Sequence, residues 1–187
     1  MLLRQATAAD AGRIAALHAD SWRRHYRGAY SDAFLDGDVA ANRLAYWSGH
    51  FARPSTDPTI VAEAGGELIG FVHVRLGHDP RWGSLVDNLH VVQAAKRQGL
   101  GTRLLTAAAR AATTDALYLW VLHQNTAAQS FYEARGGRRV ESAFASPPAG
   151  DPANLVGTPG KYRMHWADRS VLTTWPEAAY GLESQRE

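Results

Sequence analysis

The spacing of apolar positions in the first third of the chain predicts helices after one short strand. Residues 2–6 are typical of a strand, and apolar side chains then recur at roughly helical intervals over residues 8–24. Thr7 followed three residues later by Asp10 resembles a helix-capping pair. Residues 22–51 are rich in aromatic side chains and are broken by Ser-Asp and Gly-Asp pairs, so we expect two or three short helices there.

From residue 58 the pattern changes to strands that alternate with two helices. We predict strands at 59–62, 68–76, 85–92, 117–122, 138–143 and 161–166, helices at 99–112 and 125–135, and loops at 77–83 and 144–160. Helices and strands mixed around one sheet indicate an α/β or α+β fold. We expect one domain over residues 1–167, followed by a tail at 168–187 that is partly disordered or packs on the outside.

Composition excludes several classes of function. The chain has no cysteine, which rules out disulfides, thiolate metal sites and a cysteine nucleophile. There are 20 Lys and Arg against 18 Asp and Glu, without an evident basic stripe, so we expect no nucleic-acid partner. No apolar run approaches the ~20 residues of a membrane span, and the N-terminus does not resemble a signal peptide. A cytoplasmic protein is the expectation.

The most informative stretch runs from the strand Leu89-His90-Val91 through a polar turn with two glycines into a helix. Such a turn leaves backbone N–H groups unpaired at the positive end of the helix dipole, where an anion such as a pyrophosphate can bind. Alone, a Gly-x-Gly turn is weak evidence, because it also caps ordinary helices. A dinucleotide fingerprint and a P-loop both fail here, since position 104 is Leu and Gly101 is followed by Thr-Arg.

A second motif follows at residues 125–137, Asn-Thr-Ala-Ala-Gln-Ser-Phe-Tyr-Glu-Ala-Arg-Gly-Gly. Asn125 can cap the helix, and Ala128 and Tyr132 lie four residues apart on one face of it. By itself, the Phe131-Tyr132 pair is more typical of aromatic packing between a helix and a sheet.

Together the two motifs resemble the signature of the GNAT N-acetyltransferases. That signature is Gln/Arg-x-x-Gly-x-Gly/Ala after a strand ending in Leu-x-Val, then Asn-x-x-Ala-x-x-Phe-Tyr-x-x-x-Gly-Phe. Three positions depart from it: Lys96 stands for Gln or Arg, Gln93 for a frequent Pro, and Gly137 for the final Phe. The resemblance implies a twisted, mostly antiparallel sheet of about seven strands with about four helices, and acetyl-CoA as cosubstrate.

The resemblance also implies residue roles. The acceptor amine would attack the thioester directly, with Tyr132 as general acid to the leaving thiolate and Asn125 as a cofactor contact. The backbone of Leu89, His90 and Val91 would hold the pantetheine arm. The pyrophosphate would lie against the turn formed by Lys96, Arg97, Gln98, Gly99, Leu100, Gly101 and Thr102.

The general base is the least determined role. Asp87 is the first candidate, because it lies on the strand that leads into Leu89, where the family often places a carboxylate. Its alternation with the neighbouring leucines allows it to face either the core or a cleft, and a solvated strand Asp is an equal alternative. Glu63 and His90 are weaker candidates.

The acceptor amine cannot be identified from the sequence. The aromatic segment 22–51 occupies the region that lines the acceptor pocket in the family, and Tyr26 and Tyr30 are the candidates for its wall, although most of these aromatics are expected in the core. The long loop 144–160 is a candidate border of that pocket. No His-Glu-x-x-His or similar pair predicts a metal.

Two other functions remain open at this stage. One is a non-catalytic acyl-CoA-binding or sensor module of the same fold, against which the retained Tyr132 argues. The other is an acetyltransferase that acts on aminoacyl-tRNA or a protein terminus, which the lack of a basic stripe disfavours for tRNA. We expect a small-molecule or peptide amine as partner. Dimers are common in the family, so a homodimer is an open alternative that nothing in the sequence establishes.

Overall fold

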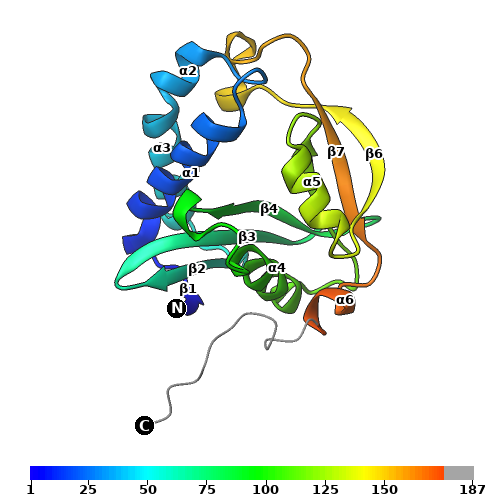
Figure 1. Cartoon of the computed structure of the whole chain (residues 1–187). Coiled ribbons are helices and arrows are strands. Elements are labelled where there is room, and N and C mark those ends of the chain that lie inside the picture. Colours follow the sequence, from blue (N-terminus) through cyan, green and yellow to red (C-terminus); the bar gives the residue numbers. More distant parts are fainter. Residues whose placement is uncertain (175–187) are drawn as a thin grey trace.

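In the computed structural model, which describes residues 1–174, one seven-stranded sheet has the order β1-β2-β3-β4-β5-β7-β6 (Figure 1). Every neighbouring pair is antiparallel except β4 and β5. This confirms the expected fold class. The strands are β1 (Leu2–Gln5), β2 (Thr59–Ala64), β3 (Glu67–Asp79), β4 (Gly83–Val91), β5 (Leu117–Leu122), β6 (Arg138–Phe144) and β7 (Gly160–Trp166).

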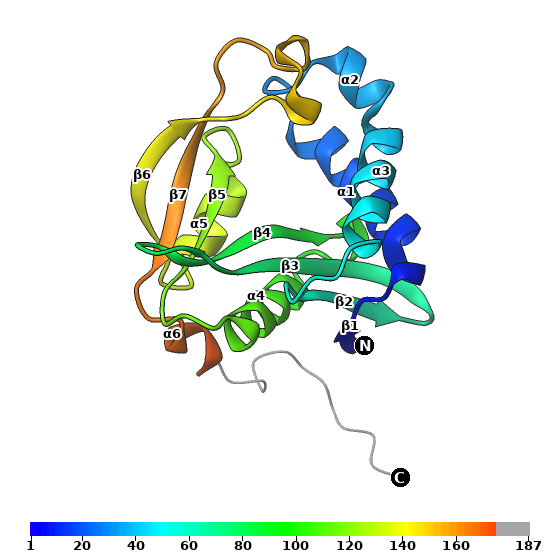
Figure 2. The ribbon, with the colours of Figure 1, turned by 180° about the vertical axis from the view of Figure 1, so that it is seen from behind.

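Helices cover both faces of the sheet (Figures 1 and 2). The side of α1 and α3 is opposite to the side of α4. Side chains alternate between the two faces along β3, which explains both layers. Phe71 packs with α1 and α3, whereas Val72 and Val74 pack with α4. The helices are α1 (Ala11–His25), α2 (Asp32–Asp36), α3 (Val39–Phe51), α4 (Leu100–Ala111), α5 (Thr126–Glu133) and α6 (Ser170–Thr173).

The single parallel pair of strands opens the sheet. β4 and β5 pair only at Ser84 with Leu117 and at Leu85 with Tyr118. Beyond these residues the two strands separate, so residues 86–91 of β4 have β3 on one side and no paired strand on the other. The separation creates an opening through the middle of the sheet.

Two predicted loops are more ordered than the sequence indicated. The prediction of a loop at 77–83 is wrong, because β3 continues to Asp79 and pairs there with Gly83 in a long hairpin. The loop at 144–160 contains two short 3-10 turns. It is held on the segment before α2, where the Ser31 N–H donates to the Asn154 carbonyl at 2.9 Å.

The beginning of the C-terminal tail packs on α4. Leu172 in α6 is buried, and the Arg169 guanidinium donates to the carbonyls of Ala109 and Thr114 at the end of that helix and after it. The rest of the tail for which disorder was predicted, residues 175–187, lies outside the described residues. None of the helices within residues 1–174 combines the length and the apolar character needed to cross a membrane.

Candidate functional site

A cleft of about 1250 Å³ occupies the opening between β4 and β5. Its lining comes from both strands, from the turn before α4 and from α5, and on the opposite face of the sheet from α1 and α3. The cleft therefore connects the two faces of the sheet, and two molecules bound from opposite sides would meet inside it.

The turn that enters α4 forms part of the lining of this cleft. Arg97 and Gly99 have φ of 62° and 78°, a left-handed conformation that glycine adopts without strain. The backbone N–H groups of residues 97–101 make no hydrogen bond to the described part of the chain. They are five donors at a helix N-terminus, which suits a phosphate or pyrophosphate.

Close packing explains the second glycine of this turn. A Cβ atom at Gly101 would lie 3.2 Å from the Phe131 ring of α5, so a side chain there would press the two helices apart. The Lys96 ammonium lies 2.7 Å from Nε2 of His25 at the end of α1, and partial burial lowers the pKa of Lys96.

Most of the predicted cofactor residues are brought together along the cleft. Its lining includes Leu89, His90, Val91, Lys96, Arg97, Gly99, Gly101, Thr102 and Asn125. The side chains of Gln98 and Leu100 lie outside it, beside a smaller pocket near Met1. Because the prediction for these two residues concerned their backbone amides, their side-chain directions do not contradict it.

Helix α5 places Tyr132 in the lining of the cleft. The ring is 8% exposed and packs edge-on against Phe131 and Trp166. Burial raises the pKa of the Tyr132 phenol, so the hydroxyl stays protonated at neutral pH. Asn125 caps the helix by accepting a hydrogen bond from the Ala128 N–H at 3.2 Å, and its amide nitrogen is left to contact a ligand.

The structure explains why Gly137 stands where the family motif has Phe. A Cβ atom at Gly137 would lie 2.7 Å from the buried Trp166 indole of β7. This indole donates to the Arg135 carbonyl at 2.8 Å, which fixes it against the end of α5. An aromatic ring from β7 therefore occupies the space beside position 137.

A β-bulge sets the direction of Asp87. Asn88 pairs with His73 and Val86 pairs with Val74, so Asp87 is the extra residue of β4. Bulges redirect side chains, and here the Asp87 carboxylate is exposed to the cleft while its two neighbours are buried. Its Oδ2 accepts from the Asn88 amide at 2.9 Å and lies 3.5 Å from the Tyr46 hydroxyl.

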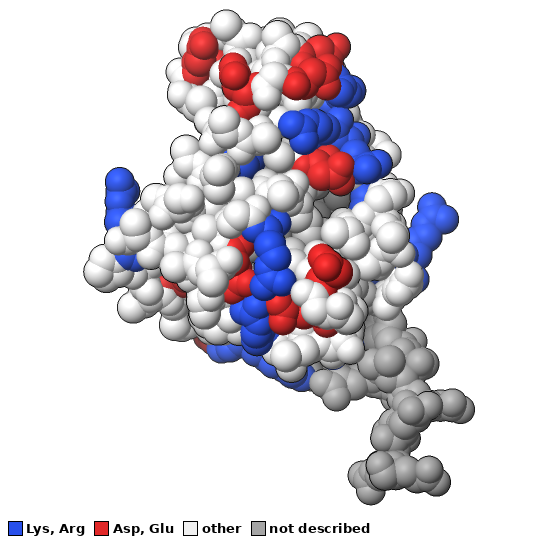
Figure 3. All heavy atoms as spheres, turned by 90° about the vertical axis from the view of Figure 1, so that its left-hand side faces the viewer, with Lys and Arg blue, Asp and Glu red and all other residues white. Residues whose placement is uncertain are grey.

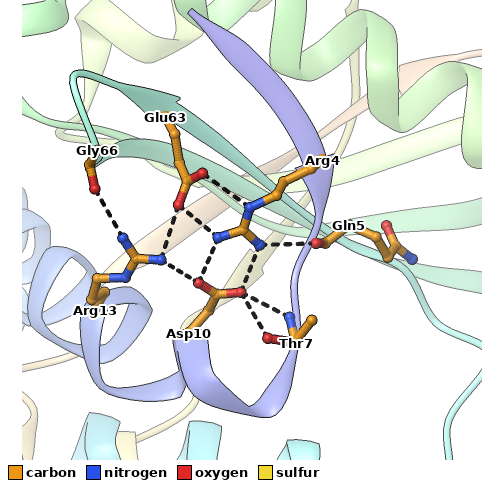
Figure 4. A network of polar contacts seen from close by, with 7 residues as sticks. All are labelled: Arg4, Gln5, Thr7, Asp10, Arg13, Glu63 and Gly66. Atoms are coloured by element: carbon orange, nitrogen blue, oxygen red, sulfur yellow. Dashed lines mark hydrogen bonds and ion pairs between the residues drawn. The ribbon is translucent and has the colours of Figure 1, made fainter.

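The other two candidate bases are less suited to the role. His90 lines the cleft, but its Nδ1 lies 2.7 Å from Ser21 Oγ, and burial lowers the pKa of His90 to about 3. Glu63 is absent from the described lining of the cleft. Both of its carboxylate oxygens accept hydrogen bonds from Arg4, and Oε1 also accepts one from Arg13 (Figure 4).

On the α1 and α3 side, the cleft has an aromatic wall. Tyr26 lines it and stacks on Trp22 at a ring separation of 5.3 Å. Tyr30 is 8% exposed, packs with Tyr26 and Phe34, and is not among the described residues that line the cleft. None of the lining comes from the loop at 144–160.

The candidates named from the sequence left out several side chains that line the cleft. Tyr46 and Arg43 come from α3, and Trp120 comes from β5. A signal existed for Arg43, because Val39, Arg43 and Trp47 recur at spacing of four and form the buried stripe of α3. A charged residue within an apolar stripe is unusual enough to mark a candidate site.

Charge outside the cleft is mixed. On the face shown in Figure 3, Lys and Arg groups lie beside Asp and Glu groups. Among residues 1–174, no three His, Asp or Glu side chains gather in a way that could hold a metal ion.

Comparisons with known proteins agree with this geometry. A family model described as the acetyltransferase (GNAT) family matches residues 19–137. A protein of Mycobacterium tuberculosis named a probable N-acetyltransferase is 28% identical over 139 residues, which cover 71% of this chain and 77% of the relative.

Two solved structures share the fold. A GCN5-related N-acetyltransferase from Rhodopseudomonas palustris has a TM-score of 0.67 at 20% identity, covering 88% of this chain and 93% of that one. The PaiA N-acetyltransferase of Thermoplasma acidophilum, solved in complex with coenzyme A, has a TM-score of 0.65 at 17% identity, covering 88% and 96%.

Proposed function

This chain belongs to the GNAT family of acetyltransferases, and we propose that it transfers the acetyl group of acetyl-CoA to a primary amine of a small molecule or peptide. The observation that carries the proposal is the cleft itself. It joins unpaired backbone donors on one face of the sheet to a carboxylate on the other, with a protonated phenol between them.

The described residues fit acetyl-CoA at the α4 side. Five free N–H groups at residues 97–101 would bind the pyrophosphate, with Lys96 and Arg97 adding positive charge. The unpaired edge of β4 at residues 89–91 would hold the pantetheine arm by backbone hydrogen bonds. The PaiA structure with bound coenzyme A supports this use of the fold.

Acetyl-CoA would supply the acetyl group as a thioester, on which the amine replaces the thiol by direct attack within a ternary complex. Asp87 would accept the proton that the amine must lose, directly or through a water. Tyr132 would donate its hydroxyl proton to the departing sulfur, and its raised pKa keeps that proton available. An acceptor that binds as an ammonium loses two protons on forming the amide: Asp87 takes one, and the other replaces the proton that Tyr132 gives to the thiol.

The first experiment is a calorimetric titration of the protein with acetyl-CoA, followed by measurement of coenzyme A release with a panel of amines. We expect micromolar binding and amine-dependent release. Binding without release by any amine would favour an acyl-CoA sensor of the same fold. A lack of binding would overturn the proposal.

Replacing the acid tests the role of Tyr132. We expect Tyr132→Phe to lower kcat by about 100-fold, in the range typical of removing a general acid, while the Kd for acetyl-CoA changes less than about threefold. Phe131→Leu, on the same helix, is the matched control for packing. An unchanged kcat in Tyr132→Phe would remove the phenol from the mechanism.

Replacing the base tests Asp87 through pH. Asp87→Asn should lower the rate more at neutral pH than at high pH, because a larger fraction of the amine is already deprotonated at high pH. The pH profile of kcat/KM measures this difference. An equal loss at every pH would argue against the base role.

A further inference from the structure

Arg43 is a buried cation that forms no ion pair with the described residues. The residue is 9% exposed, yet it lines the cleft on the α1 and α3 side, here called the acceptor side because the amine would enter there. Within residues 1–174 no Asp or Glu forms an ion pair with it, and its recorded hydrogen bonds go to the neutral amide oxygen of Asn42, from Nε and Nη2. Burying a guanidinium without a counter-ion is costly, and burial lowers the pKa of Arg43.

Aromatic rings hold this guanidinium in place. Its Cζ lies 4.1 Å from the Trp22 ring centroid and 5.0 Å from that of Tyr46, distances at which a cation is attracted to a ring face. These contacts fix the orientation of Arg43 but carry no negative charge. Nη1 has no hydrogen bond to the described residues, and so it remains available to a ligand in the cleft.

Tyr46 links this cation to the candidate base. Its ring contacts Arg43, and its hydroxyl lies 3.5 Å from the Asp87 carboxylate. A positive and a negative group thus face the same part of the cleft, separated by about one tyrosine side chain. Arg75 also lines the cleft, so the described acceptor side holds two arginines against one carboxylate.

We propose that Arg43 binds an oxyanion of the acceptor while Asp87 receives its amine, so that the substrates of this protein are amines that carry an anionic group nearby. The planar fork of arginine suits a carboxylate, as in an amino acid, or a phosphate, as in a phosphorylated amine. This inference rests on the proposed function and specifies its substrate class. A peptide N-terminus, which has an amide in place of the carboxylate, fits the site less well.

The test compares matched acceptors. L-amino acids, their carboxamides and the corresponding decarboxylated amines form the panel, with O-phosphoethanolamine as the phosphate arm, and coenzyme A release is the readout. We expect kcat/KM to be at least about tenfold higher for the anionic member of a set. Equal rates for amino acids and carboxamides, with no preference for the phosphorylated amine, would overturn the inference and leave the acetyltransferase proposal intact.

Variants connect the selectivity to Arg43. Arg43→Met should raise KM for anionic acceptors about 10- to 100-fold, the range expected for losing charge-assisted hydrogen bonds, and the preference for anionic over plain amines should disappear. Arg43→Lys should lie between the two, and the exposed Arg110→Met serves as the control. An unchanged preference in Arg43→Met would contradict the role of this residue.

A binding measurement separates this inference from the proposed function. If acetyl-CoA binds but no amine is acetylated, the amino acids and O-phosphoethanolamine are titrated into protein saturated with coenzyme A. Binding that Arg43→Met weakens at least tenfold would support the anion site while the transfer proposal fails. Absence of binding by every anionic probe would overturn the anion site as well.

Discussion

Two buried charged residues in this protein, Asp10 and Arg43, have opposite kinds of surroundings. At the start of α1, Arg4 and Arg13 surround the buried Asp10 and the partly buried Glu63 (Figure 4). In the cleft, Arg43 is buried with two aromatic rings and a neutral amide as its recorded partners among the described residues. Asp10 is paired directly with cations, whereas Arg43 forms no ion pair within residues 1–174.

The closed cluster ties three separate elements together. Arg4 lies on β1, Glu63 on β2 and Asp10 just before α1, and the Asp10 carboxylate also accepts from the Thr7 N–H at 2.8 Å. Hydrogen bonds from Arg4 hold the pKa of Asp10 far below its usual range, and Arg13 acts in the same direction. Such a cluster stabilises the fold and leaves no charge for a ligand.

Arg43 in the cleft shows the opposite case. A buried charge without a partner costs stability, so its persistence at the wall of a cleft points to compensation by a bound group. The contrast between the two clusters predicts opposite effects on stability when each is mutated.

The largest effect should come from Asp10→Asn. Removing this carboxylate leaves Arg4 and Arg13 with Glu63 as their shared anion, and we expect the free energy of unfolding to fall by about 3 kcal/mol. The melting temperature should fall by about 6–12 °C for a chain of this size. Chemical denaturation at pH 7 measures the change, and acetyl-CoA affinity should not move. The exposed Asp38→Asn is the control, and a loss below about 1 kcal/mol would show that the network is weak.

Lowering the pH should gradually weaken the ion pairs that Asp10 and Glu63 make with the two arginines. The pKa of Asp10 and that of Glu63 are lowered in the fold, so their stabilisation is present above the ordinary carboxyl pKa of about 4 and is lost as the pH falls below it. The difference in unfolding free energy between the wild type and Asp10→Asn should therefore shrink from pH 5 to pH 3. A constant difference over that range would contradict the assignment.

The smallest effect on stability should come from Arg43→Met. Replacing an uncompensated buried cation by an apolar side chain of similar length is often neutral or stabilising, and the lost cation–π contacts offset part of the gain. We expect a change between zero and about 2 kcal/mol of stabilisation, measured by denaturation without ligand. A destabilisation comparable to that of Asp10→Asn would mean that Arg43 is a structural residue.

The fold and the turn before α4 were largely predictable because their signals are local. The turn at residues 96–102 and the α5 segment each lie within one short stretch of chain, and hydrogen bonding within that stretch determines which N–H groups stay free. The contact between Asp10 and Thr7 was also predictable, because the two residues are only three positions apart in the sequence. The two arginine partners of Asp10 were not predicted.

The acceptor side was less predictable because it depends on contacts between distant segments. Nothing within residues 22–51 distinguishes Tyr26, which lines the cleft, from Tyr30, which packs behind it. Prediction of a loop at 77–83 failed for a related reason, since the pairing of Asp79 with Gly83 needs the whole hairpin to extend.

The sequence by itself determined the family, the order of most elements and the position of Tyr132 on the helix after β5, since each follows from patterns within a few helical turns. Only the tertiary structure decided the separation of β4 from β5, the bulge that turns Asp87 into the cleft, and the burial of Arg43 beside Trp22. These features arise from packing between residues far apart along the chain, where strand register and the absence of a counter-ion exist only after folding.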